Sequence, residues 1–142
     1  MKPTLFLRIA GVLAIVMAIL HTIGGVFGKP DPGPATSAVL AMQSNHFNLT
    51  GFDRSYWDFY IGFGIGITIS LVAEGIVFWI LASLAKTYAA KLRPIFIVFG
   101  IAYIALAVVA WRYIFLPPMV CELLIAACLL LAAFTAKSSS TA

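Results

Sequence analysis

Hydrophobic positions along the chain gather into four long runs, and polar residues gather between them. A helix that crosses the hydrocarbon core of a bilayer needs about 20 mainly apolar residues. The runs that meet this need cover residues 5–27, 57–85, 94–115 and, just long enough, 119–136. The pattern therefore predicts an all-α integral membrane protein, an antiparallel four-helix bundle that forms a single membrane domain over residues 1–142.

Prolines mark the predicted ends of these spans. Residues 29–34 hold three prolines and cannot continue a helix, because proline lacks the N–H donor and restricts the residue before it. Pro94 stands at the predicted start of the third span, where a missing N–H costs nothing. The prolines in residues 116–118 predict a tight reversal before the fourth span. The Ser/Thr-rich tail 137–142 is expected to fray.

The connection over residues 28–56 is too long to be a simple link between two spans. Its middle, residues 36–47, is compatible with a helix, and Thr36 or Ser37 can cap the start. We expect this outer segment to carry a short extra helix that lies on, or dips into, one end of the bundle.

The composition supports the membrane interpretation. Hydrophobic residues make up 63% of the chain and charged residues 10%, against about 45–50% and about 25% in soluble domains. A soluble chain of this length buries only about two thirds of its surface and cannot hide that much apolar area. Disorder, collagen and coiled coil are excluded by the same figures. A disulfide scaffold is excluded because the two cysteines, Cys121 and Cys128, lie seven positions apart on one predicted helix.

The distribution of Lys and Arg predicts the orientation, because cytoplasmic loops carry an excess of these residues. Six basic residues fall on the side of the termini: Lys2, Arg8, Lys86, Lys91, Arg93 and Lys137. Three fall on the other, outer side: Lys29, Arg54 and Arg112. We therefore expect both termini in the cytoplasm. The net charge of +4 follows from this bias and is no sign of nucleic-acid binding.

The N-terminus also has the features of a signal peptide, with Lys2 ahead of an apolar core. No small-residue cleavage site follows, and the apolar stretch continues to Phe27, which favours a retained helix. Cleavage would leave three spans with unchanged orientation.

Residues 54–64 read RSYWDFYIGFG, and His21 stands in the first span. These two features resemble a family of small bacterial four-helix integral membrane proteins. Members carry Arg-Ser/Thr-Tyr-Trp-Asp-Phe-Tyr-x-Gly-Phe-Gly at the start of their second helix. The resemblance implies four spans in the inner (cytoplasmic) membrane of a bacterium and a shared outer-face motif, and it carries over no assigned chemistry.

Ionisable side chains inside hydrocarbon are candidate functional groups, because each costs at least about 2.5–3.5 kcal/mol near mid-span. At 1.5 Å per residue, every predicted span delivers polar groups to the outer leaflet. The expected ligand-binding residues are His21, Asn45, His46, Arg54, Tyr56, Trp57, Asp58, Tyr60, Arg112 and Glu122. If the protein is an enzyme, His21, Asp58 and Glu122 are the candidates for acid–base catalysis.

Structural roles explain the same residues equally well. Arg112 and Glu122 can form an ion pair that joins the third and fourth spans. Asp58 can cap its helix or pair with Arg54. The aromatic residues can form an interfacial belt.

Glu74 stands apart from this outer cluster. It lies sixteen positions after Asp58, about 24 Å further along the helix and about 160° around it. The two carboxyl groups therefore cannot form an acid–base dyad. Near mid-membrane, Glu74 is expected to be a neutral, hydrogen-bonded carboxylic acid.

No cofactor is predicted. A haem or metal held through His21 and His46 is a minor possibility, since no other histidine and no ligand-spacing motif exists. Gly62, Gly66 and Ser70 form a small-residue face that we interpret as a site of close helix packing within the core.

Three functions remain open. The first is binding, or cofactor-free acid–base conversion, of an amphipathic or lipid-like small molecule in an outward-facing polar pocket. The second is a non-enzymatic accessory subunit of a membrane complex. The third, a channel or carrier formed by a homo-oligomer, is weaker because the second span offers few polar residues.

Overall fold

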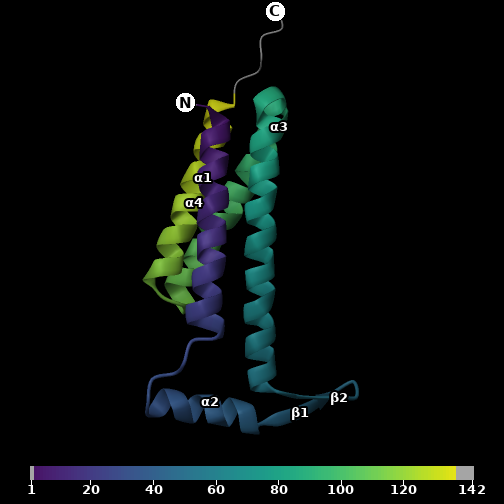
Figure 1. The fold of residues 1–142 in the computed structure, drawn as a ribbon, viewed down its shortest axis with the longest axis vertical. Coiled ribbons are helices and arrows are strands. Elements are labelled where there is room, and N and C mark those ends of the chain that lie inside the picture. The colour runs from purple at the N-terminus through teal and green to yellow at the C-terminus, as the bar shows by residue number, and fades with distance from the viewer. Residues whose placement is uncertain (1, 137–142) are drawn as a thin grey trace, which may run out of the picture. The chain divides into compact units, whose positions relative to one another are not determined.

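A computed structural model describes residues 2–136 of the chain, and most of them are helical (Figure 1). The predicted fraying of 137–142 lies outside these residues. In chain order the elements are α1 (Pro3–Leu20), the π-helix η1 (His21–Val26), α2 (Pro34–Ser44), β1 (His46–Leu49), β2 (Phe52–Ser55), α3 (Tyr56–Tyr113) and α4 (Leu116–Thr135). They form two compact units: residues up to Met17 together with those from Leu71 onward, and residues 18–70.

Three helices of the described part are long and apolar enough to cross a membrane: α1 continued by η1, α3 and α4. The helix α3 has 58 residues and contains one non-helical residue, Tyr88 (φ −118°, ψ 25°), where two helices join. Pro94 lies inside the second of these helices rather than at its start, so the predicted boundary there was wrong. The basic residues Lys91 and Arg93 extend this helix before the apolar run begins.

The first unit has one hydrophobic core to which α1, both parts of α3 and α4 contribute. Its largest fully buried side chains are Tyr103, Phe78, Phe96, Leu7, Ile125 and Leu129. Glycines allow two of these helices to approach closely. A Cβ added to Gly75 of α3 would lie 2.7 Å from Ile15 Cδ1 and 3.1 Å from the carbonyl oxygen of Gly11, both on α1.

The second unit contains the predicted extra helix. The helix α2 runs from Pro34 to Ser44, so it begins and ends two or three residues earlier than expected. Gly33 precedes it with φ +106°, and Pro34 occupies its first position, where no N–H is needed. The helix α2 ends before residue 47 because the backbone becomes extended at Asn45 and continues as a strand.

A two-stranded antiparallel hairpin follows α2. This hairpin was not predicted from the sequence. His46 pairs with Ser55 and Leu49 with Phe52. The turn takes Thr50 (φ 52°) and Gly51 (φ 88°) into the left-handed region, as hairpin turns of type I′ require. The hairpin ends at Ser55, and α3 begins at the next residue, Tyr56.

Candidate functional site

The second unit holds eight of the ten predicted ligand-binding residues, and three local arrangements position them. The first is a polar seam between η1 and the start of α3. Tyr60, Gly64 and Thr68 stand four positions apart and therefore share one face of α3. The His21 Nε2–H donates to the carbonyl oxygen of Gly64 over 3.1 Å. Because a carbonyl oxygen only accepts, this contact puts the hydrogen on Nε2 and fixes the orientation of the ring.

Two further contacts between η1 and α3 complete the seam. The Tyr60 hydroxyl donates to the carbonyl oxygen of Gly25 over 2.9 Å, one of the last carbonyls of the helix, which have no partner within it. Thr22 and Thr68 bring their hydroxyl oxygens to 2.9 Å. Single π turns are rare in proteins, and those that occur often lie at functional sites. The seam is therefore a candidate part of a functional site.

The other ring nitrogen of His21 lies beside the backbone of its own helix. A Cβ on Gly25 would lie 3.3 Å from its Nδ1, so this nitrogen faces the backbone of η1. Among the described residues no group of three His, Cys, Asp or Glu side chains lies in position to hold a metal ion. His46 contacts a different partner, Asp53, with 3.2 Å between Nδ1 and Oδ2.

The second arrangement is a capping box at the start of α3. The Ser55 N–H and hydroxyl both donate to Asp58 Oδ2, over 2.8 and 2.9 Å. In return the Asp58 N–H donates to the Ser55 hydroxyl oxygen over 3.1 Å. This reciprocal pattern satisfies donors that a helix start leaves free. It confirms the interpretation of Asp58 as a cap.

Two ion pairs were possible from the sequence, Arg54–Asp58 and Arg112–Glu122, and neither is present in residues 2–136. His46–Asp53 is the one side-chain pair of opposite charge type within 4.0 Å there, and both side chains are exposed. Of the two roles open to Asp58, the structure shows the cap. Arg112 instead lies over the Tyr113 ring, 5.4 Å from its centroid, a cation–π contact available to an exposed guanidinium.

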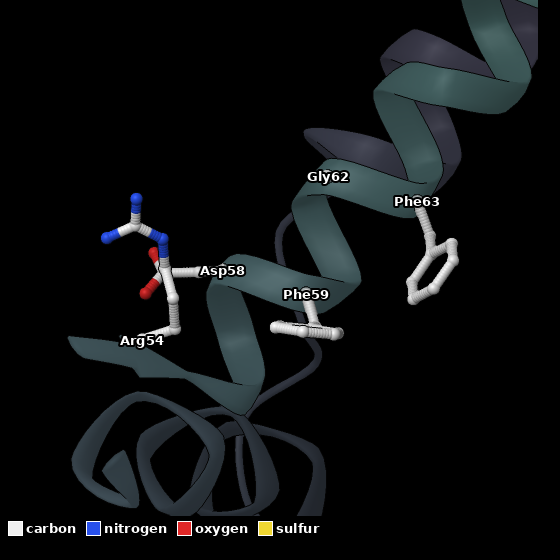
Figure 2. A pocket seen from close by; sticks show the side chains of 5 residues that line it. All are labelled: Arg54, Asp58, Phe59, Gly62 and Phe63. Carbon is white, nitrogen blue, oxygen red and sulfur yellow. The ribbon is translucent and has the colours of Figure 1, made fainter. Parts of the chain in front are cut away.

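The third arrangement is an open surface hollow of about 350 Å³ at the junction of β2 and α3, called the cavity below. It is lined by Arg54, Asp58, Phe59, Gly62 and Phe63. Figure 2 shows the charged groups of Arg54 and Asp58 on one side of the helix and the Phe63 ring on the other. Gly62 stands between them without a side chain. Two predicted residues, Arg54 and Asp58, thus share a cavity with three residues that were not predicted to bind a ligand.

The glycine face of α3 does not pack as predicted. A Cβ added to Gly62 or Gly66 would meet no atom within 4 Å, so neither allows a close helix contact in the described chain. Gly64, two positions away, is the one that packs: its Cβ would lie 2.8 Å from Val26 Cγ2. The small residues do have helical spacing, but the glycine that packs, Gly64, lies about 200° around α3 from Gly62, on the opposite side of the helix.

Aromatic rings surround the junction of hairpin and helix. Phe47 of β1 contacts Tyr56 and Phe59, each with centroids 5.2 Å apart. Trp57 and Tyr60 stack at 5.1 Å with an interplanar angle of 20°. Asn45 is part of the α2 terminus, where its side chain donates to the carbonyl oxygen of Ala41 over 2.7 Å.

The first unit holds the remaining predicted residues. The Tyr103 hydroxyl donates to Glu74 Oε2 in a short hydrogen bond, which agrees with the expected hydrogen-bonded state of Glu74. Glu122 is buried, and its Oε2 has no hydrogen-bond partner within residues 2–136. Tyr103 is a polar partner that sequence reasoning missed, because a tyrosine in an apolar run gives no signal that its hydroxyl meets a carboxyl group. A pocket that combines His21 with Arg112 and Glu122 stays a prediction.

Comparison with models of protein families, with curated proteins and with solved structures gives no match. Function is therefore inferred from the contacts within each unit.

Proposed function

We propose that the chain is a four-span protein of a bacterial inner membrane, with both termini in the cytoplasm and residues 28–56 outside. The combined length of the two helices in α3 supports this: 58 residues amount to about 87 Å of helix at 1.5 Å each, far more than one crossing of a core of about 30 Å. The join at Tyr88 lies between Lys86 and Lys91, where the positive-inside rule expects a cytoplasmic turn. The bundle is then antiparallel.

We propose further that the outer side binds an amphipathic or lipid-like small molecule in the cavity at the start of α3. One observation carries this proposal: a cation, a carboxylate and two phenyl rings line the same cavity. Its volume is about 350 Å³, and it is open along much of its boundary. A molecule with a charged or polar head and an apolar body matches this lining.

The chemistry of each lining group assigns the parts of the ligand. The Arg54 guanidinium suits an anionic oxygen group, with which it can form paired hydrogen bonds. Asp58 Oδ2 is occupied by the capping box, which leaves Oδ1 to accept from a ligand hydroxyl or amine. Phe59 and Phe63, 41% and 69% exposed, offer apolar area to the body of the molecule. Gly62 lets that body approach the helix backbone.

The test is mass spectrometry of lipid extracts from protein purified in mild detergent. Arg54→Gln is compared with Lys29→Gln, which removes a positive charge from the same outer segment but not from the cavity. A hydrogen bond to a charged group contributes about 1.5–3 kcal/mol. Loss of that bond lowers retention of the ligand by about 10-fold to about 100-fold.

A second matched pair tests the apolar half of the cavity. Phe63→Ala removes a lining ring, whereas Phe27→Ala removes a ring of similar exposure, 63%, that does not line the cavity. We expect the specific co-purifying molecule to be lost in Arg54→Gln and Phe63→Ala and kept in both controls. Equal retention in all four variants would refute the cavity as the binding site.

A second candidate function, an accessory subunit of a membrane complex, is favoured by the open glycine face. Gly62 and Gly66 have no atom of the described chain near the Cβ position, and small residues let a partner helix approach closely. Gly66→Leu fills this face from a position outside the cavity lining, but its side chain leans toward Gly62 of that lining, so retention of the ligand is measured on the same variant. Loss of a co-purifying membrane protein from Gly66→Leu alone would support the accessory role over ligand binding.

A further inference from the structure

The β1–β2 hairpin has two chemically different faces. Its register pairs Phe47 with Arg54 and Leu49 with Phe52 on one face, because alternate residues of a strand point to the same side. The opposite face carries His46, Asn48, Asp53 and Ser55. The first set is called the apolar face below, and the second the polar face.

The apolar face is uncovered at the tip of the hairpin. Leu49 is 57% exposed and Phe52 61% exposed. The polar face, in contrast, is held by its own contacts, with His46 bonded to Asp53 and the Asn48 side chain accepting from the Gly51 N–H over 3.1 Å. The fold therefore presents two large apolar side chains on one side of a short ribbon and hydrogen-bonding groups on the other.

The apolar face is continuous with the exposed apolar surface of α3. Phe47 contacts Phe59, and Phe59 contacts Phe63 with centroids 6.0 Å apart. Phe63 is itself 69% exposed on a helix long and apolar enough to cross a membrane. Ring contacts thus connect the hairpin, through Phe47 and Phe59, to the exposed Phe63 of α3.

The chain connection keeps the hairpin at the end of that helix. Ser55, the last residue of β2, directly precedes Tyr56, the first residue of α3, and the capping box fixes this corner. A strand of four residues extends only about 13 Å. The Arg54 guanidinium lies 5.5 Å from the centroid of the Phe52 ring, so a cation accompanies the apolar tip on the same face. Apolar side chains with an adjacent guanidinium fit the boundary between acyl chains and phosphate groups.

We propose that the hairpin is an interfacial anchor, with Leu49 and Phe52 inserted among the lipids and Arg54 at the phosphate level. This inference shares Arg54 with the proposed cavity and depends on the proposed membrane placement of α3, so the positions probed below lie outside the cavity lining. The anchor holds the start of α3, and hence the mouth of the cavity, at the depth of the lipid head groups. An amphiphile already in the outer leaflet then reaches the cavity by lateral movement.

Depth-dependent quenching of a site-specific probe tests the anchor. Single cysteines are introduced in a background in which Cys121 and Cys128 are replaced by Ala, and each is labelled with an environment-sensitive fluorophore. The apolar-face variants are Leu49→Cys and Phe52→Cys, the polar-face variants are Asn48→Cys and Asp53→Cys, and the α3 control is Ile69→Cys, at a position 64% exposed. The protein is reconstituted into phosphatidylethanolamine–phosphatidylglycerol vesicles that contain doxyl-labelled lipids.

We expect blue-shifted emission and strong quenching at positions 49 and 52, and neither at the adjacent positions 48 and 53. A doxyl group near the head of the lipid should quench positions 49 and 52 best, because an interfacial element is buried only about 5–10 Å. A doxyl group deep in the acyl chain should quench position 69 best. This pattern supports the anchor.

The other outcomes overturn it in distinguishable ways. Quenching at position 69 without quenching at 49 and 52 refutes the anchor and leaves the membrane placement standing. No quenching at any position refutes the membrane placement itself. Blue-shifted emission at 49 and 52 without lipid quenching shows that protein, such as a second copy of the chain, covers the face. Equal quenching of both faces refutes the amphipathic orientation of the hairpin.

Discussion

The contact between η1 and α3 gives a prediction in which one glycine is compared with another on the same helix. Gly64→Ala places a methyl group 2.8 Å from Val26 Cγ2, closer than real contacts of this type. Val26 is buried and β-branched, so it cannot rotate away without strain. Gly66→Ala adds the same methyl group where nothing lies within 4 Å.

The comparison isolates the contact because both substitutions change helix propensity equally. Replacing a helical glycine by alanine stabilises by about 1 kcal/mol in each variant, and this contribution cancels in the difference. Overpacking at Gly64 costs about 1–3 kcal/mol. If η1 moves away from α3, the hydrogen bond from His21 to the Gly64 carbonyl is also lost. This loss costs a further ~0.5–1.5 kcal/mol of stability. We therefore expect Gly64→Ala to be less stable than Gly66→Ala by about 1–4 kcal/mol.

The assay is reversible unfolding of purified protein in mixed micelles by increasing sodium dodecyl sulfate, followed by tryptophan fluorescence. Val26→Ala combined with Gly64→Ala removes the clashing methyl groups, so the penalty of Gly64→Ala should fall in that background. Equal free energies of unfolding for Gly64→Ala and Gly66→Ala, within about 0.5 kcal/mol, would refute the described packing of η1 on α3.

Three further predictions concern polar contacts. Ser55→Ala removes the cap of α3 and should cost about 1 kcal/mol, with faster amide hydrogen exchange confined to the first turn of α3; exchange spread along the whole helix would contradict a capping role. Tyr103→Phe leaves the Glu74 carboxyl without its donor and should lower the free energy of unfolding by about 1–3 kcal/mol. Adding Glu74→Met should restore most of that loss, and an additive double variant would contradict the bond. His46→Gln should change stability by less than about 1 kcal/mol, because exposed pairs contribute little; a larger change would show that the hairpin contact is not exposed in solution.

The helices could be predicted from sequence because their signals are long. Runs of about 20 apolar residues and the prolines of residues 29–34 indicate helix and break over many positions. The short hairpin has no such redundancy. Its alternation of Phe47, Leu49, Phe52 and Arg54 covers only four residues on each strand, and the helix predicted over residues 36–47 took in the first two residues of β1. Gly51, three positions after Asn48, was the available turn signal.

The candidate site was predictable in its residue types and less so in their grouping. The RSYWDFYIGFG stretch did contain the capping aspartate, a cavity arginine and the aromatic rings. Whether Asp58 meets Ser55 or Arg54 depends on a turn geometry that residue identity alone does not determine. In the same way, helical spacing shows that Gly62, Gly64 and Gly66 are small, but only the position of Val26 decides which of them is packed.

The two ends of the hairpin lie next to each other, so its length can change while the helices on either side keep their positions. The Tyr56 N–H donates to the carbonyl oxygen of Asn45 over 3.3 Å, and His46 pairs with Ser55, so the residues on either side of the hairpin are joined directly. A segment whose two ends meet can change in length with little entropic cost. Insertions and deletions at Thr50 and Gly51 can therefore vary the reach of the hairpin among descendants of this chain, while the end of α2 and the start of α3 keep their positions.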